Sequence, residues 1–293
     1  MIRPSLAGWL FAAPALMVLG VFFFLPVAAA LALSLTDFDL YALADARNLR
    51  FVALGNYIDL LQAPMFWKAL GNTAYFVVVG VPLSIAVSLG AALLLDARAA
   101  RFKPLFRTAL FAPVVTTLVA VAVIWRYLFN TQYGLVNWAL GLAGIAPVDW
   151  FGDVRWAMPT IIAFAVWKNF GYNMIIFLAG LQAIPRDLYE AARIDGASRW
   201  QQFAHITLPQ LGPVLVVVGV ITVSGYFQLF AEPYVMTRGD PLQSTVSLLY
   251  FMFEEGFKWW TLGRASAIAF LLFLVILAAT TVLLRVGRRR GLV

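Results

Sequence analysis

Cysteine is absent from this 293-residue sequence, and histidine occurs only once, at His205. The chain therefore offers no disulfide and no cysteine-based metal site, and a lone histidine in a polar stretch is a poor candidate for catalysis or metal binding. Charge is scarce as well: charged residues make up 12% of the chain, whereas hydrophobic residues make up 63%. Soluble domains are usually about 45–50% apolar. The composition predicts a protein solvated by lipid.

Catalytic signatures are also missing. The sequence has no glycine-rich loop ending in Gly-Lys-Ser/Thr, no His-Glu-x-x-His and no nucleophile elbow. We therefore expect a protein that is not an enzyme, binds no metal or other cofactor of its own, and takes energy from elsewhere. The surplus of positive charge lies at the ends of apolar runs rather than on a folded basic face, which argues against nucleic acid as a partner.

Long apolar runs dominate what is present. A helix needs roughly 20 apolar residues to cross a bilayer. Six runs meet this length: 6–35, 69–95, 108–129, 157–181, 208–230 and 265–284. The first run exceeds the roughly 7–15 apolar residues of a cleavable signal, so we expect a permanent helix. The sequence predicts an all-α integral membrane protein with six transmembrane helices in a single domain, residues 1–293.

The distribution of lysine and arginine predicts the orientation. With six spans, one side carries both termini and the second and fourth loops, with 12 lysine and arginine residues, and the other side carries 8. Cytoplasmic loops carry the excess of positive charge. We expect both termini, and the polar loop 186–207, to be cytoplasmic.

This loop has the pattern of two short helices joined by an elbow. Asp187 and Glu190 have capping-box spacing, which predicts a helix from about Leu188. Gly196 tolerates the positive φ of a corner, and Ser198 can cap a second helix. We expect the apolar side chains to face the body of the protein and the charged ones to face a partner; the apolar set is Leu188, Ala191, Ala192, Ile194, Trp200 and Phe203.

The loop also carries a family resemblance. Its motif residues are Glu190-Ala191-Ala192, Asp195-Gly196-Ala197, Ile206, Pro209 and Pro213. They resemble the EAA loop of the permeases of bacterial binding-protein-dependent ABC importers, and the rest of the chain resembles the sugar-importer branch, as in maltose or lactose systems. The resemblance implies the type I importer permease fold, a bacterial inner-membrane location and ATPase-coupling roles for Glu190, Ala191, Ala192, Asp195, Gly196 and Ala197. It also implies a homologous second permease, two cytoplasmic ATPases that bind ATP and magnesium, and an external solute-binding protein.

Polar residues inside the fourth and fifth runs predict where solute passes. Rings combined with amide and hydroxyl groups suit sugars, and the resemblance places the cavity on these helices. The candidates are Trp167, Asn169, Tyr172, Asn173, Thr222, Tyr226, Gln228 and Leu229. Ser224, Gln228 and Glu232 form a polar stripe at i, i+4 and i+8. The same residues could instead bind neighbouring helices together.

Two other functions remain open at this stage. The importer could carry a non-sugar polar solute such as a phosphorylated polyol. Alternatively, Lys168 could be the proton-linked charge of an ion-driven carrier, although such carriers typically contain inverted repeats and need no docking loop. In the importer hypothesis, ATP drives a movement of the loop 186–207. The helices expected at 157–181 and 208–230 carry this movement to the solute cavity, which produces alternating access.

Overall fold

The computed structural model describes residues 4–97, 102–289 and 291, and its regular elements are helices; the described residues form no strand beyond one isolated bridge. The all-α prediction is confirmed. The chain divides into two compact units, residues 1–66 with 251–273 and residues 67–250 with 274–293. Four of the positive charges counted for orientation, Arg3, Arg98, Arg101 and Arg290, lie outside the described residues.

Among the described residues, four to six helices can cross a membrane. Four are long and apolar enough alone: Gly8–Ser34, Pro64–Asp96, Val154–Ala183 and Leu262–Arg289. Two bent pairs raise the number to six if each pair is one span; they are Lys103–Val115 with Leu118–Leu128, bent by 98°, and Arg199–Gln210 with Gly212–Phe227, bent by 66°. Each predicted run therefore has a helical counterpart.

The first unit begins with an almost continuous helix. α1 (Pro4–Leu19) passes through a π-helical turn (Gly20–Phe24) into α2 (Leu25–Ser34). The amide of Leu25 bonds back to the carbonyl of Gly20, five residues earlier. Pro26 follows directly and has no amide hydrogen to donate, so the widened turn coincides with the place where the regular bonding pattern fails.

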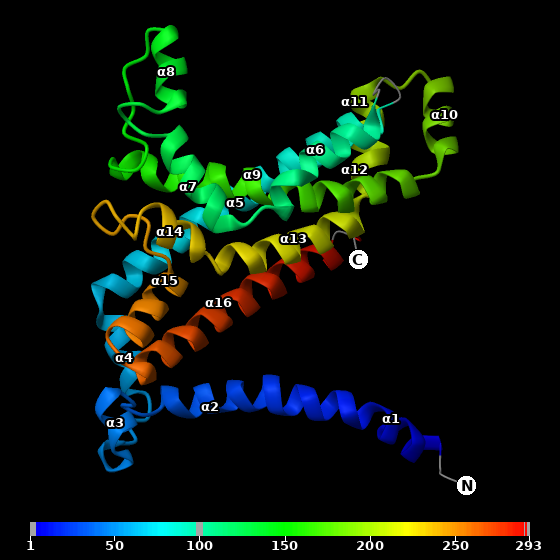
Figure 1. Cartoon of the computed structure of the whole chain (residues 1–293). Coiled ribbons are helices and arrows are strands. Elements are labelled where there is room, and N and C mark those ends of the chain that lie inside the picture. The colour runs from blue at the N-terminus through cyan, green and yellow to red at the C-terminus, as the bar shows by residue number, and fades with distance from the viewer. Residues whose placement is uncertain (1–3, 98–101, 290, 292–293) are drawn as a thin grey trace. The chain divides into compact units, whose positions relative to one another are not determined.

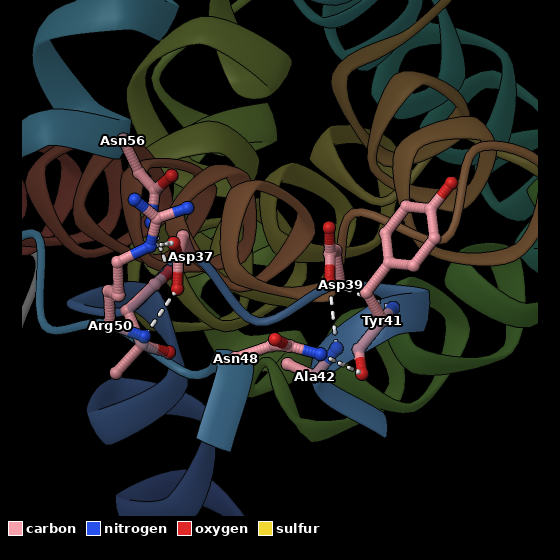
Figure 2. Close-up of polar contacts among 8 residues, drawn as sticks. Asp37, Asp39, Tyr41, Ala42, Asn48, Arg50 and Asn56 are labelled. Carbon is pink, nitrogen blue, oxygen red and sulfur yellow. Dashed lines mark hydrogen bonds and ion pairs between the residues drawn. The ribbon is translucent and has the colours of Figure 1, made fainter. Parts of the chain in front are cut away.

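A compact polar loop follows α2 and contains α3 (Leu40–Ala44), a 3-10 turn (Ala46–Asn48) and α4 (Gly55–Gln62). The Asp39 carboxylate caps α3 by accepting the amides of Tyr41 and Ala42, both at 2.9 Å (Figure 2). Asp37 accepts the Arg50 amide at 2.6 Å and pairs with its guanidinium at 3.3 Å. These local bonds fix the start of α3 and join the Asp37 and Arg50 ends of the segment.

Two further contacts attach this loop to the rest of the unit. The Asn56 side-chain amide donates to the carbonyls of Ser34 and Thr36, each at 2.8 Å. The Gly263 amide donates to the Phe38 carbonyl at 2.9 Å. A Cβ at position 263 would lie 2.2 Å from the Thr36 carbonyl oxygen, so only glycine permits this approach. The unit also contains a π-helical turn, Glu254–Lys258, before α16 (Leu262–Arg289).

The second unit is a bundle around one central helix, α9 (Val154–Ala183). The other helices with residues in this unit are α5 (Pro64–Asp96), α6 (Lys103–Val115), α7 (Leu118–Leu128), α8 (Leu135–Leu142), α10 (Arg186–Ile194), α11 (Arg199–Gln202), α12 (Leu208–Gln210), α13 (Gly212–Phe227), α14 (Ala231–Met236) and α15 (Leu248–Phe253). The helices α5 and α15 also have residues in the first unit, and residues 274–289 of α16 belong to the second. In Figure 1, α10 and α11 lie at one end of α9, and α7 and α8 lie at the other. Two-thirds of the apolar stretch of α9 is buried, which makes it the core helix of this unit.

The core next to α10 and α11 is apolar and tightly packed. Phe177, Met174 and Leu211 are fully buried there. Gly171 allows α6 to approach α9 closely, because a Cβ at this position would lie 2.6 Å from the Leu110 carbonyl oxygen. Small residues serve this purpose wherever membrane helices pack backbone to backbone.

The run 108–129 forms two helices joined at a bend rather than one continuous helix. It breaks at Thr116 and Thr117, whose ψ angles of 152° and 128° are extended. Pro113 weakens the last turn of α6 because it cannot donate an amide. The Thr116 hydroxyl donates a hydrogen bond to the Pro113 carbonyl at 2.6 Å and so caps the end of α6.

The run 208–230 is also shorter as a helix than predicted. The chain passes from α11 through a π-helical turn (Phe203–Thr207) and α12, and α13 then runs only from Gly212 to Phe227. Pro213 stands near the first turn of α13, where a missing amide hydrogen costs nothing. Leu229 and Phe230 therefore lie beyond the helix.

Candidate functional site

The loop 186–207 folds as helix, elbow and helix. α10 begins at Arg186, two residues before the predicted start, and has no side-chain cap. The predicted capping box at Asp187 and Glu190 is wrong, because Pro185 ends the preceding segment and the helix starts directly after it. Glu190 instead lies 3.6 Å from Arg193, with both side chains about half exposed, an arrangement that contributes little to stability. Its carboxylate remains accessible to a partner.

The elbow is confirmed in detail. Gly196 has a φ of +77°, and two amides close the end of α10: Gly196 donates to Arg193 at 3.1 Å and Ala197 to Ala192 at 2.8 Å. This is the Schellman arrangement, which requires a left-handed residue where Gly196 lies. α10 therefore ends at one defined angle to the segment that follows.

The second helix of the loop starts with a complete capping box. The Ser198 hydroxyl accepts the Gln201 amide at 3.3 Å, and the Gln201 side chain accepts the Ser198 amide at 2.7 Å. The predicted cap at Ser198 is confirmed. Thr207 does not cap the helix that follows, because it lies in helical conformation and the chain continues through it.

A tyrosine that the sequence analysis missed fastens α10 to the bundle. The Tyr189 hydroxyl lies 2.9 Å from the Thr207 hydroxyl, and its ring packs against the apolar core formed by α9 and Leu211. Tyr189 and Thr207 are 18 residues apart, so no local pattern predicted the contact. Movement of α10 is thereby connected to the start of the fifth run.

The prediction that the apolar side chains of the loop face the body is wrong for four of the six, because Leu188, Ala191, Ile194 and Trp200 are all exposed. Ile194 is 87% exposed and Trp200 is 73% exposed. They flank the elbow, and Tyr189 takes the inward position on α10 instead. The exposed residues of the loop thus include large apolar side chains as well as the accessible carboxylate of Glu190.

A cavity of about 370 Å³ lies in the same unit. It is lined by Phe76, Val114, Ala165, Asn169, Tyr172, Asn173, Ile221, Thr222, Gly225, Tyr226, Gln228, Leu229 and Glu232. Seven of the eight predicted solute residues are in this set. The walls mix rings, amides, three hydroxyl-bearing side chains and one carboxylate, which suits a polar solute with apolar faces.

Trp167 is the predicted residue that does not line the cavity. Its ring packs against those of Trp125, at 5.6 Å between centroids, and Phe164, at 6.3 Å. The turn of α9 directs Trp167 to α7, whereas Asn169 and Tyr172 line the cavity. Trp167 is therefore a packing residue in this structure.

Two contacts hold α13 in the cavity wall, one to α9 and one to α5. The Asn173 side-chain amide donates to the Thr222 hydroxyl at 3.0 Å in a buried position. The Tyr226 ring lies 5.0 Å from the Phe76 ring, in space left by Gly80, where a Cβ would come within 2.7 Å of the ring. The wall is thus fixed by one polar contact and one packed ring.

Lys168 has a structural role that the sequence did not reveal. It is 7% exposed, and its ammonium group donates to the Val114 carbonyl at 3.0 Å. Val114 is in the last turn of α6, where carbonyls have no partner in the helix and a positive charge is favourable. Lys168 therefore caps α6 at the bend before α7.

The comparisons with known proteins agree with this architecture. Residues 80–291 match the family model described as "Binding-protein-dependent transport system inner membrane component". The lactose transport system permease protein LacF of Rhizobium radiobacter is 37% identical, over 92% of this chain and 90% of that protein. The trehalose/maltose transport system permease protein MalF of Thermococcus litoralis is also 37% identical, over 98% of this chain and 96% of that protein.

A solved structure has the same fold. It is a chain of a bacterial ABC transporter involved in the import of the acidic polysaccharide alginate, with a TM-score of 0.79 over 96% of each chain and 23% sequence identity. The predicted type I importer permease fold is confirmed by this likeness.

Proposed function

We propose that this chain, which belongs to the family of binding-protein-dependent transport system inner membrane components, moves a sugar or oligosaccharide through the cavity between α9 and α13. The observation that carries the proposal is the cavity lining, in which the rings of Tyr172 and Tyr226 lie together with the amides of Asn169 and Asn173. Aromatic faces stack on sugar rings, and amides bond to hydroxyls. Relatives named for lactose and for trehalose/maltose transport support the same class.

The energy for transport comes, in this proposal, from two cytoplasmic ATPases that hold ATP and magnesium. A homologous second permease completes the membrane part, and an external binding protein delivers the solute. The exposed apolar residues Ile194 and Trp200 beside Glu190 support a docked partner at the loop 186–207. An alginate transporter structure in complex with a "periplasmic protein" has the same fold.

The proposed docking of cytoplasmic ATPases at the loop 186–207 also determines the orientation of the chain in the membrane. We place both termini and α10 in the cytoplasm of a bacterium, as the excess of lysine and arginine on that side supports. Alternating access then requires that the ATPases bind α10 differently in two states. Tyr189, through Thr207, connects that difference to the cavity wall on α13.

The alternative functions have less support. A phosphorylated polyol would bring a dianion to a cavity whose described ionisable lining residue is the carboxylate of Glu232. An ion-driven carrier would need a mobile charge, whereas the Lys168 ammonium already caps α6. The saccharide importer is consistent with both the lining of the cavity and the exposed residues of the loop 186–207.

Tyr172→Ala tests the cavity assignment. Tyr172 is 49% exposed on the cavity wall, and loss of its ring and hydroxyl should cost about 1–2 kcal/mol of solute binding. We expect roughly a 5- to 30-fold higher apparent KM for saccharide uptake, with assembly and basal ATPase activity intact.

Tyr75→Ala is the matched control. Tyr75 is 47% exposed on α5 and lines neither cavity of the second unit, so its truncation should leave KM unchanged. If Tyr172→Ala instead separates the permease pair in detergent and removes ATPase activity, these residues hold subunits together and the solute path lies in the partner permease.

A further inference from the structure

A second cavity, of about 350 Å³, lies near the end of the second unit opposite α10. Its wall is built from α7 and from the loops on either side of α8, and it contains the rings of Tyr127, Tyr133 and Phe151 together with Arg126 and Asp149. The functional site described above uses none of these residues. The sequence analysis did not group them as a site, because they are spread over the chain from Arg126 to Phe151.

Local hydrogen bonds hold this outer cavity in shape. The Asn130 carboxamide oxygen accepts the amides of Gln132 and Tyr133, at 2.9 and 3.3 Å. The Asp149 carboxylate accepts the Thr131 hydroxyl at 3.0 Å and the Gly152 amide at 3.0 Å. The two loops are therefore joined across the cavity, and the cavity has a fixed wall before any ligand arrives.

The rings are also held in place from behind. Phe129 stacks on Trp125 at 4.8 Å with an angle of 11°, and it meets the edge of Trp150 at 5.4 Å. Tyr127 and Tyr133 are 6.5 Å apart and about two-thirds exposed. A supported aromatic wall that keeps two exposed tyrosines is suited to stacking against a flat, partly apolar ligand.

The polar groups specify the class of ligand. In the part of the chain that the structure describes, Arg126 forms no ion pair, so its guanidinium donors are available. A guanidinium, a carboxylate and tyrosine hydroxyls beside aromatic faces match the alternating hydroxyl groups and apolar faces of a sugar.

The helix α14 contributes to the walls of both cavities. Glu232 lines the inner cavity and Met236 lines the outer. These residues are four apart on one helix, a rise of about 6 Å. We propose that the outer cavity is a second saccharide subsite, so that an oligosaccharide of three or more units contacts both cavities while a disaccharide contacts one. This inference rests on the proposed function and specifies its substrate class by length.

Chain-length dependence of uptake tests the subsite. The complex, purified with its partner chains and binding protein and placed in proteoliposomes, is assayed with maltose through maltopentaose and with the arabino-oligosaccharide series. For Tyr133→Ala and for Arg126→Gln, we expect KM to rise roughly 3- to 10-fold for the tetra- and pentasaccharides and to change less than about twofold for the disaccharides. Tyr133→Phe should retain most of the wild-type value, because the ring remains.

Trp138→Ala is the control, since Trp138 is 64% exposed on the neighbouring helix α8 and lines neither cavity. A KM that rises equally for every chain length would overturn the proposal and assign this surface to contact with the binding protein. An unchanged KM for every length in both variants would also overturn it. If the wild-type complex moves no member of either series, the proposed saccharide function fails first, and the subsite fails with it.

Discussion

Replacing Gly196 with valine is expected to abolish solute uptake while the chain remains folded and assembled in the membrane. Gly196 has a φ of +77°, and a Cβ added there meets nothing within 4 Å. The substitution therefore causes no clash, and its effect is backbone strain of about 1–3 kcal/mol. Relief of this strain rotates α10 away from its fixed angle. ATP-driven uptake should fall by at least about tenfold.

Gly144→Val provides a control with matched strain. Gly144 has a φ of +74°, and its Cβ position is equally open, but it follows α8 rather than α10. We expect this variant to transport normally. Gly196→Asn should also retain transport, because asparagine tolerates the left-handed region. Full transport by Gly196→Val would remove the coupling role of the elbow.

Replacing Gly171 with valine is expected to prevent stable folding. The added Cβ would lie 2.6 Å from the Leu110 carbonyl oxygen and 3.1 Å from the Phe111 Cα. These are backbone atoms of α6, which cannot rotate away as a side chain can. Overpacking of this kind costs about 1–3 kcal/mol or more. The yield of monodisperse protein and its thermal midpoint should both fall.

Gly90→Val is the control for that experiment. Gly90 lies within α5, and a Cβ there meets nothing within 4 Å. The variant adds the same side chain to a membrane helix without the contact, so we expect wild-type yield and midpoint. Equal losses in both variants would mean that valine is harmful for reasons other than the approach of α6 to α9.

Local signals explain which parts of the fold were predictable. The corner at Gly196 and the cap at Ser198 depend on residues within five positions of each other, and both were found from the sequence. The apolar runs likewise depend on composition alone. The capping box at Asp187 was predicted on the same kind of signal, but Pro185 started the helix earlier.

Contacts between distant residues explain what was missed. The break at Thr116 depends on Lys168 as well as on Pro113, because Lys168 caps the end of α6 from 54 positions away. On α10, Tyr189 occupies the inward position and contacts Thr207, while Ile194 is exposed. Hydrophobic pattern alone assigns all apolar residues to the interior, and so it misplaces a surface that is kept for a partner.

The candidate cavity was largely predictable because its residue types are unusual in a membrane helix. Asn173 and Thr222 stand out in an apolar run, and they bond to each other. Phe76 does not stand out among apolar neighbours, although it lines the same cavity. Trp167 was predicted to line the cavity because of its aromatic ring. Its position around the axis of α9 instead directs the ring to Trp125 and Phe164.

Uptake of a labelled oligosaccharide into proteoliposomes tests the central claim most directly. The vesicles contain the purified complex and the binding protein, with either ATP or an imposed proton or sodium gradient as the energy source. The account predicts accumulation that requires both ATP and the binding protein, that no ion gradient supports, and that a folded Lys168→Met variant retains. Accumulation driven by an ion gradient without ATP, and lost in Lys168→Met, would contradict the importer account and favour an ion-coupled carrier.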